Sequence, residues 1–381
     1  MSLSVEETEI GSVHIDQLEL ESGCILKDVS LVYERSGPRD GPLVLVEHAL
    51  TGNHRTVGTE RDPGWWRGLI GPGRFIDTRR YQVLTFNMLG GSDGSTGPKS
   101  VRPGGDGPYG TTFPFITIRD MVNAEYEALR KIGVHHVRAV IGGSLGGMRT
   151  LEWAVMYPSF MDMIFPLAVT PKLSAFGIAF NALARQAIMS DPAWQDGRYD
   201  ESAPPYQGMI LARMAGMLTY RTGALFEARF GREEKEGWGR AHDEIAYQVE
   251  SYLLHHGRKF AARFDANSYL YLLKAMDRHD LLRDRISPDD VFKRIRARVV
   301  AIAFSGDLIY PPDELKLFVL RLKESGGHGS FHLVPTQFGH DGFLTEFDAW
   351  GWVIQEALAD QLKDHDVVAL PYAPVTRFHS G

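Results

Sequence analysis

Ser144 lies in the segment "IGGSLGGMRT", which matches the pattern Gly-x-Ser-x-Gly of serine nucleophiles. The strand-like run "VRAVI" precedes the serine, and "LGGMRTLEWAVMY" follows it with apolar residues at helical spacing. A nucleophile elbow needs this order, because the serine lies on a tight turn between strand and helix where neighbouring side chains would collide. Gly142 and Gly146 leave that space free. The sequence therefore predicts Ser144 as a catalytic nucleophile.

A second match to the same pattern, "GGSDG" around Ser92, lacks this context. The residues that follow it, "GSTGPKSVRPGG", contain prolines and glycines that do not continue a helix. We interpret the segment around Ser92 as a glycine-rich turn without a nucleophile.

A serine hydroxyl becomes reactive only when a base removes its proton and a carboxylate orients that base. In this pattern the acid and the histidine follow the serine in that order, each after a later strand. Asp307 comes directly after the run "VVAIAF", and His340 lies in a loop beyond "SFHLV" with a glycine before it. Asp341 is a rival acid, but a residue next to the histidine does not easily turn back onto its ring, so a ligand-facing role suits it better. The predicted triad is Ser144, Asp307 and His340.

The developing oxyanion needs two backbone donors close to the serine. The N–H of Leu145 is one candidate, because it begins the helix after the serine and lies at the positive end of the helix dipole. The N–H of Leu50 is the other, in the turn that follows the early strand "LVLVE" and precedes Gly52. A glycine turn without any role at Leu50 remains the alternative.

The elements that must position these residues alternate between strands and helices along most of the chain. Strand-like runs rich in Val, Ile and Leu are found at residues 29–33, 43–47, 81–86, 137–141, 163–169, 299–304 and 330–334. Helical spacing of apolar residues is found at residues 116–132, 145–156, 313–323 and 345–362. This alternation predicts an α/β fold with a mostly parallel sheet and helices on both faces.

One long interval interrupts the alternation between the fifth and the sixth of these strands. Residues 171–290 show helical patterns, at 179–189, 206–220, 244–256 and 267–276, and no convincing strand. We therefore predict a core formed by residues 1–170 and 291–381, with residues 171–290 inserted as a helical lid over the carboxyl edge of the sheet.

Composition excludes several classes of function. The chain has 381 residues, of which 44% are hydrophobic and 23% charged, with a formal net charge of −7 and no basic run, which argues against nucleic acid as the main ligand. The single cysteine, Cys24, suits a reducing compartment, and no run of about 18 apolar residues is present to span a membrane, so we expect a cytoplasmic protein. His48 and His54 lack nearby Cys or carboxylate partners, so no metal site is predicted.

Several motifs together resemble the homoserine O-acetyltransferases of the α/β-hydrolase fold. They are "EHALTGN", "NMLGGSDGSTGP", "FPFITIRDMVNAE", "GGSLGGMRTLEWA", "SDPAWQDGRY", "ARMAGMLTYRT", "SGDLIYPP" and "FGHDGFL", which run in family order from about His48 to Leu344. The resemblance implies acetyl transfer from acetyl-CoA to the hydroxyl of L-homoserine in methionine synthesis, through an acyl-serine intermediate in a ping-pong scheme. It also implies a homodimer that associates through the lid, with acetyl-CoA as a co-substrate and no permanently bound cofactor.

Residue by residue, the resemblance places the nucleophile, acid and base on the three predicted triad positions. It places the homoserine-binding arginine on Arg213 and the substrate-binding aspartate on Asp341. An amino-acid substrate fits this pair, because a guanidinium binds its carboxylate and a carboxylate binds its ammonium group. Arg185 is a second lid arginine that either shares this task or forms an ordinary salt bridge.

Two positions depart from relatives of this kind. Arg149 stands where the family usually has glutamine; one interpretation is that it simply faces solvent, and its role and the acceptor stay open. Ile309 stands where the succinyl-using relatives carry an arginine; a buried succinyl carboxylate without a cation is costly, so acetyl is favoured. The alternatives are a serine or other hydroxy-amine O-acetyltransferase, a serine esterase or hydrolase with the same triad, and a non-catalytic binding protein of the same fold.

Overall fold

The computed structural model describes residues 8–236, 241–362 and 368–369, and its main sheet has nine strands in these residues, in the order β1-β2-β6-β3-β7-β8-β9-β10-β11. The strands are β1 (Glu9–Glu19), β2 (Ile25–Ser36), β3 (Leu43–Glu47), β6 (Gln82–Phe86), β7 (Val137–Gly143), β8 (Met161–Leu167), β9 (Arg298–Phe304), β10 (Gly329–Val334) and β11 (Val368–Ala369). A separate small pair is formed by β4 (Ile70–Gly71) and β5 (Ile76–Asp77).

The sheet is parallel except at one edge. Pairs from β6 through β3, β7, β8, β9 and β10 to β11 are parallel, whereas β1 pairs antiparallel with β2 and β2 antiparallel with β6. All seven predicted strands are present, and the predicted α/β fold with a mostly parallel sheet is confirmed. The sequence analysis missed β1, whose inward residues Val13, Ile15 and Leu18 alternate with polar ones.

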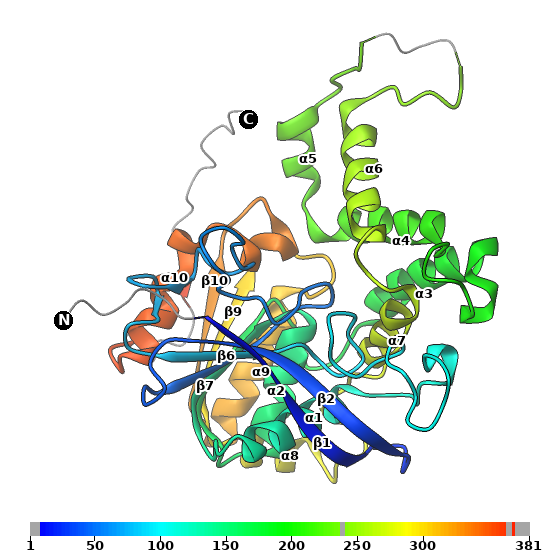
Figure 1. The fold of residues 1–381 in the computed structure, drawn as a ribbon. Coiled ribbons are helices and arrows are strands. Elements are labelled where there is room, and N and C mark those ends of the chain that lie inside the picture. Colours follow the sequence, from blue (N-terminus) through cyan, green and yellow to red (C-terminus); the bar gives the residue numbers. More distant parts are fainter. Residues whose placement is uncertain (1–7, 237–240, 363–367, 370–381) are drawn as a thin grey trace.

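Helices cover both faces of the sheet, and the alternation of side chains along β3 shows why (Figure 1). Leu45 belongs to the apolar cluster that includes α1 (Ile118–Lys131), α2 (Leu145–Met156) and α9 (Pro312–Glu324). Val44 and Val46 point to the opposite face, where they join the cluster that contains Trp350 of α10 (Phe347–Leu358). Strands buried on both faces need this apolar composition throughout.

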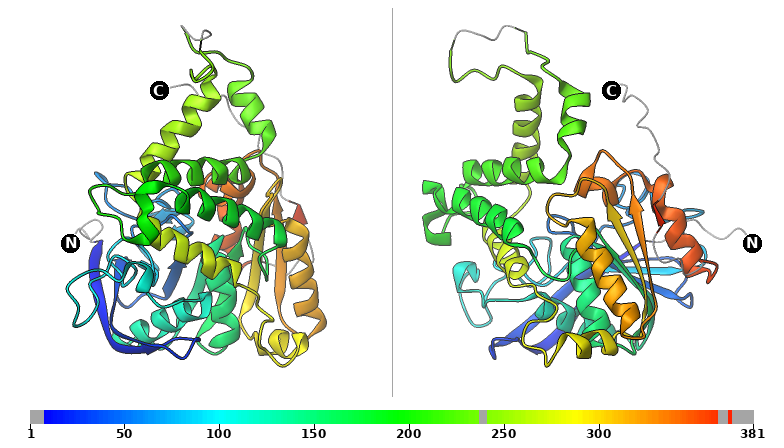
Figure 2. Two further views of the ribbon diagram at one scale, coloured as in Figure 1. Left: turned by 90° about the vertical axis from the view of Figure 1, so that its right-hand side faces the viewer. Right: turned by 180° about the vertical axis from the view of Figure 1, so that it is seen from behind.

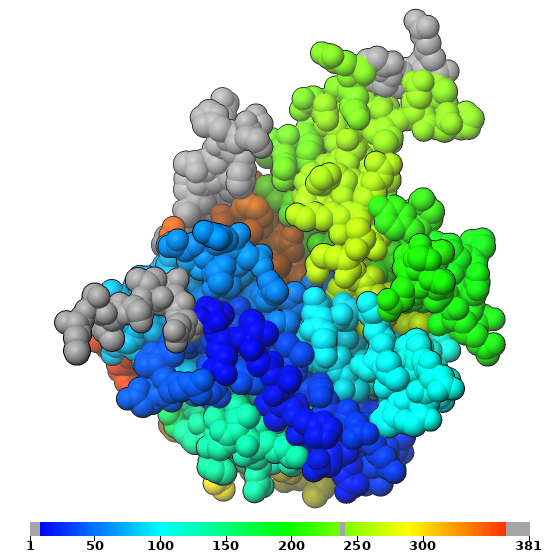
Figure 3. Space-filling model, viewed as in Figure 1, coloured from blue at the N-terminus to red at the C-terminus, as the bar shows by residue number. Residues whose placement is uncertain are grey.

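The segment between β8 and β9 is helical and rises above the carboxyl edge of the sheet (Figure 2). It contains α3 (Ala175–Met189), α4 (Tyr206–Tyr220), α5 (Gly223–Phe230), α6 (Gln248–Ala261), α7 (Ala266–Asp277) and α8 (Pro288–Arg294). In the space-filling view α5 and α6 stand out from the body of the molecule (Figure 3). The last helix, α8, contacts α2 and α9 of the core, and the predicted lid boundary at residue 290 falls inside it.

The two chain crossings between core and lid are tied to each other. Leu173 donates a backbone hydrogen bond to His279 O at 3.1 Å, and Leu281 donates one to Pro171 O at 2.8 Å. The His279 ring is buried there, and burial together with nearby arginines lowers its pKa to about 3, so the ring is neutral. These contacts fix the base of the lid beside the sheet. Among the residues described, no helix has the length and hydropathy to cross a membrane.

Candidate active site

Ser144 lies at the turn between β7 and α2 in a conformation that side chains rarely adopt. Its φ of 59° and ψ of −125° lie outside the helical and extended regions, and its residue is only 6% exposed. The turn is possible because its neighbours lack side chains: a Cβ on Gly142 would lie 2.6 Å from the Gly146 backbone, and a Cβ on Gly146 would lie 2.0 Å from Glu47 O. This is the geometry that the Gly-x-Ser-x-Gly pattern predicted.

Asp307 and His340 meet at the carboxyl ends of β9 and β10. His340 Nδ1 lies 2.7 Å from Asp307 Oδ2, and Asp307 Oδ1 accepts hydrogen bonds from the N–H groups of Ile309 at 3.0 Å and Tyr310 at 2.9 Å. Gly339, with φ of 58°, forms the turn before the histidine. The carboxylate thus fixes Nδ1 of His340 as a donor and leaves Nε2 as the ring nitrogen that can accept a proton.

Burial and charge act in opposite directions on His340. Burial disfavours the imidazolium, but the negative charge and hydrogen bond of Asp307 outweigh it, and the pKa of His340 is raised above its ordinary value. The rings of Tyr220, Tyr310 and Phe343 surround the imidazole, with centroids at 5.8, 5.1 and 5.3 Å. The histidine is therefore an oriented base in a nearly dry site.

Ser144 and His340 line the same small cavity, of about 70 Å³. Its other lining residues are Ala49, Leu50, Thr51, Asn181, Arg213, Tyr220, Met276, Ile309, Tyr310, Asp341, Phe343 and Leu344. Among the hydrogen bonds of the described residues, none joins Ser144 to His340. Such bonds are often long before substrate binds, so the shared cavity is the relevant observation.

The two candidate oxyanion donors approach the serine from different elements. Leu145 is the first residue of α2, and its N–H lies in the helical turn that Ser144 begins. Leu50 lies in the loop after β3 and lines the cavity, and its N–H has no acceptor among the hydrogen bonds of the described residues. Both residues lie in the predicted elements, at the start of α2 and in the loop after β3, and their part in an oxyanion site stays a prediction.

The lid supplies Arg213, from α4, to the wall of this cavity. Its guanidinium lies over the rings of Tyr220, at 5.4 Å, and Phe260, at 5.5 Å. No ion pair within the described part of the chain involves Arg213, which leaves its donors for a ligand. Arg185 differs, because it forms an ion pair with Asp277 at 2.6 Å. This agrees with the interpretation that Arg185 forms an ordinary salt bridge.

Asp341 also lines the cavity, but it has a partner that the sequence did not indicate. Arg221 Nε donates to Asp341 Oδ2 at 2.9 Å, and Arg221 also contacts the hydroxyl of Tyr252 on α6. The carboxylate is therefore held by the lid and keeps Oδ1 for a ligand. This contact joins the lid to the loop that carries His340.

The interpretation that Arg149 faces solvent is wrong. Its side chain is 0% exposed and contacts the carboxylates of Glu47 and Glu125 and the carbonyl oxygen of His48. The position on α2 faces the carboxyl end of β3 and helix α1, so it lies under the site. The helical spacing around Ser144 could have indicated a buried position, but not these partners.

The sequence analysis also missed Tyr310, Tyr220 and Asn181, which line the cavity. Tyr310 is the informative omission, because it lies three residues after Asp307 and its buried hydroxyl interacts with Ser144, although no hydrogen bond of ordinary geometry holds it among the described residues. Burial raises the pKa of both tyrosines, so both hydroxyls are protonated. Tyr220 and Asn181 come from lid helices, and nothing local in the sequence aims them at Ser144.

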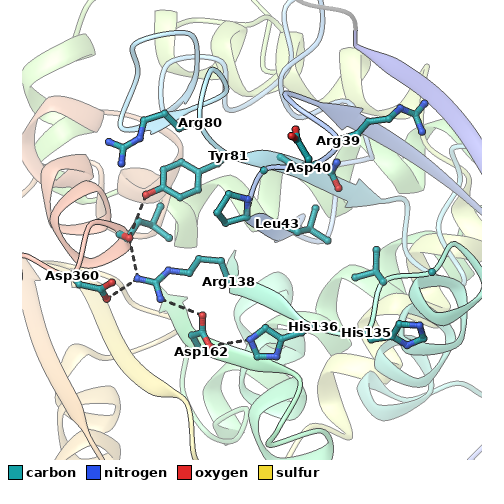
Figure 4. Close-up of a pocket in the computed structure, with 16 residues that line it drawn as sticks. Arg39, Asp40, Leu43, Arg80, Tyr81, His135, His136, Arg138, Asp162 and Asp360 are labelled. Atoms are coloured by element: carbon teal, nitrogen blue, oxygen red, sulfur yellow. Dashed lines mark hydrogen bonds and ion pairs between the residues drawn. The ribbon is translucent and has the colours of Figure 1, made fainter.

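A larger hollow of about 770 Å³ lies at the opposite end of the sheet, where β3, β6, β7 and β8 begin (Figure 4). Several of its charged groups pair with one another: Arg138 donates to Asp162 at 3.2 Å and to Asp360 at 2.6 Å, and His136 lies 2.9 Å from Asp162. Catalytic residues of parallel sheets gather at the carboxyl ends, so we assign no chemistry to this hollow. In the described residues no cluster of three or more His, Cys, Asp or Glu could hold a metal ion.

Known proteins show the same fold and the same arrangement of the chain. A family model for the alpha/beta hydrolase fold matches residues 42–347. A homoserine O-acetyltransferase of Moorella thermoacetica is 42% identical over 354 residues, which covers 91% of this chain and 95% of that protein.

Two solved structures are similar at low sequence identity. A homoserine O-acetyltransferase from Bacillus anthracis has a TM-score of 0.87 at 24% identity and covers 95% of this chain and 100% of that one. An esterase has a TM-score of 0.85 at 24% identity and covers 92% of this chain and 100% of that one. These two show the fold alone, whereas the close sequence relative shows more: the chain belongs to the homoserine O-acetyltransferase family of the α/β-hydrolase fold.

Proposed function

We propose that the protein transfers an acetyl group from acetyl-CoA to the hydroxyl of L-homoserine, through an acetyl-serine intermediate. The observation that carries this proposal is the content of one small cavity: Ser144, the Asp307-bonded His340, and the guanidinium of Arg213 line it together. A nucleophile alone would fit any serine hydrolase. An arginine without an ion pair beside it supports an acceptor that carries a carboxylate.

In the first half-reaction His340 Nε2 takes the proton of Ser144 Oγ as the oxygen attacks the thioester carbonyl. The N–H groups of Leu50 and Leu145 hold the oxyanion of the tetrahedral intermediate. The C–S bond then breaks, the proton on His340 passes to the departing thiolate, and CoA leaves. Ser144 then carries the acetyl ester.

In the second half-reaction the homoserine hydroxyl takes the place of the thiol. His340 removes its proton, the hydroxyl attacks the acetyl ester, and the same two N–H groups hold the second oxyanion. When the intermediate collapses, Ser144 Oγ recovers its proton from His340 and O-acetylhomoserine leaves. Arg213 binds the homoserine carboxylate and Asp341 the ammonium group, so the hydroxyl reaches the ester in a fixed orientation.

Transfer requires that water be kept from the acetyl-serine. Ser144, Asp307 and His340 are 6%, 5% and 4% exposed, under helix α4 of the lid. Hydrolysis by the same triad is the rival activity, and the likeness of the fold to an esterase supports keeping it as the second candidate. Ile309, buried in the wall of the cavity, supports an acetyl rather than a succinyl donor.

We also propose that the protein is a cytoplasmic homodimer that associates through the lid. Large apolar side chains are exposed on α3 and α4, among them Phe176 at 51%, Leu183 at 56%, Leu211 at 55% and Leu218 at 54%. Apolar patches of this kind are typical of interfaces between protein chains. The free, exposed thiol of Cys24 fits a reducing compartment.

Thiol release from acetyl-CoA tests the assignment of donor and acceptor. We expect sustained CoA release with L-homoserine, and a kcat/KM about 10–200-fold lower with L-serine, which is one methylene shorter. Succinyl-CoA should give little release, because its carboxylate would be buried without a cation. Equal decay of the acetyl-enzyme with and without homoserine would assign the protein as an esterase, and strong turnover with serine alone would replace the acceptor.

Arg213→Gln tests the carboxylate site. Losing a hydrogen-bonded charge pair of about 1.5–3 kcal/mol should raise KM for homoserine about 10–100-fold, with acetylation of the enzyme by p-nitrophenyl acetate unchanged. Arg185→Gln is the matched control, because that arginine is on the neighbouring lid helix and ion-paired with Asp277. An unchanged KM in the Arg213 variant, or an equal rise in the control, would contradict the assignment.

The pH dependence of acetylation by p-nitrophenyl acetate tests His340 as the base. The base works when neutral, so the raised pKa of His340 predicts a rate that increases with pH and has its midpoint above 6.5. Asp307→Asn removes the charge that raises this pKa, so the midpoint should fall to lower pH while the maximal rate drops by roughly 10³–10⁴-fold. A midpoint that stays in place in this variant would show that another group limits the rate.

Sedimentation equilibrium tests the dimer. We expect twice the chain mass for the unaltered protein, and a shift toward the single-chain mass for Leu211→Asp combined with Leu218→Asp, because buried charges disfavour association. Leu317→Asp, on α9 of the core at a side chain 41% exposed, is the control and should leave the mass unchanged. A single-chain mass for the unaltered protein would reject the dimer.

A further inference from the structure

Arg149 is buried directly beneath the loop that carries Leu50. From α2 its Nη1 contacts the carboxylates of Glu47, at the end of β3, and Glu125, on α1, while Nη2 donates to His48 O at 2.6 Å. All three charged side chains are at most 1% exposed. A guanidinium is suited to such a place, because its planar fork can serve several acceptors at once.

Two buried carboxyl groups face the one guanidinium of this cluster. Trp153 Nε1 donates to Glu47 Oε1 at 3.0 Å and to Glu125 Oε2 at 3.2 Å, so the two carboxyl groups lie side by side around one cation. Burial, and the adjacent Glu125, raise the pKa of Glu47 well above its usual range, although Arg149 opposes the shift. Arg149 is thus the cation that both carboxyl groups share.

The contacts of His48 connect Arg149 with the loop that carries Leu50. The His48 ring is held at both nitrogens, because Nε2 accepts from the Met88 N–H at 3.0 Å and Nδ1 lies 2.9 Å from Ala49 O. Burial and the charge of Arg149 lower the pKa of His48 well below its usual value, so the ring stays neutral in this tautomer. Ala49 O also accepts from the Gly52 N–H at 2.9 Å.

A trans peptide points its carbonyl and its N–H in opposite directions. The His48 ring and the Gly52 N–H both donate to Ala49 O, which fixes the direction of the carbonyl in the peptide between Ala49 and Leu50. The N–H of Leu50 is therefore turned the other way, and Leu50 lines the cavity that contains Ser144. The orientation of this donor depends on the His48 ring and backbone, which Arg149 anchors from below.

We propose that Arg149 is a positioning residue for the oxyanion site: by holding the His48 carbonyl, it fixes the loop that presents the Leu50 N–H to the reacting carbonyl. The inference rests on the proposed acyl-serine chemistry but not on the identity of donor or acceptor. Arg149 itself touches neither substrate nor Ser144. Its removal should therefore lower the rate of acylation without weakening the binding of the ester.

The test is Arg149→Met, assayed by acetylation of the enzyme with p-nitrophenyl acetate. Methionine is of similar length but has no donor for His48 O, so kcat should fall about 10–100-fold with KM within about threefold, less than the roughly 10²–10³-fold loss caused by deleting an oxyanion donor outright. If this variant does not fold, Arg149→Met with Glu125→Gln removes the uncompensated carboxylate and gives the same readout.

Arg285→Gln is the matched control. Arg285 is ion-paired with Glu152, a buried residue of helix α2, the helix that carries Arg149. Its hydrogen bonds within the described residues go to Glu152 and to the carbonyl oxygen of Leu281, not to the loop after β3. We expect a comparable drop in the unfolding midpoint and an unchanged kcat. A folded Arg149 variant with the unaltered kcat, or an equal loss of kcat in the Arg285 variant, would overturn the proposal.

The same assay separates this proposal from the proposed function. The ester needs neither acetyl-CoA nor homoserine, so a wrong donor or acceptor leaves the comparison of Arg149 and Arg285 variants intact. Ser144→Ala should abolish acetylation. If it does not, the acyl-serine chemistry fails, and the Arg149 proposal fails with it for that separate reason.

Discussion

The close approach of helix α2 to the carboxyl end of β3 is the constraint on which the site depends. A Cβ at Gly146 would lie 2.0 Å from Glu47 O, so any side chain there would push the helix away from the strand. The contact places the start of α2 beside the end of β3, and Leu50, in the loop after β3, lines the same cavity as Ser144. The strained φ of 59° at Ser144 is accepted because strand and helix are both held by the core on either side of the turn.

Burial strengthens the electrostatic interactions in the site. The pair of Asp307 and His340 is almost fully buried, and in such surroundings a carboxylate orients and stabilises an imidazolium more effectively than in solvent. The lid produces this burial with α4, which contacts the segment Gly339–Leu344 that carries the histidine. The ion pair of Arg221 and Asp341 fastens the same segment to the lid. The lid and the segment that carries the catalytic histidine are thus packed against each other.

Two arginines of the protein show how burial changes the energetics of an ion pair. Arg138 borders the hollow at the far end of the sheet, where its partner Asp360 is 70% exposed and solvent screens the attraction. Arg149 is fully enclosed with Glu47, so desolvation is severe; its Nη1 and Nη2 have acceptors, whereas its buried Nε has none among the described residues. Placing such a group beneath the Leu50 loop gives that loop little freedom to move. Rigid donors are what an oxyanion site needs, because they require no rearrangement as charge develops.

The sequence by itself determined the alternation of strands and helices, the elbow at Ser144, and the positions of Asp307 and His340 after later strands. These features are local, since hydrophobic periodicity and glycine spacing reflect conformations within a few residues. It did not reveal β1, whose pairing with β2 shows only as weak alternation, nor the burial of Arg149 or the hold of Arg221 on Asp341. The burial of Arg149 and the contact of Arg221 with Asp341 depend on partners more than twenty residues distant in the chain, such as Glu125, and on the lid docking over the sheet. Only tertiary packing decides which charged side chains lose their water, because desolvation depends on every element that surrounds them.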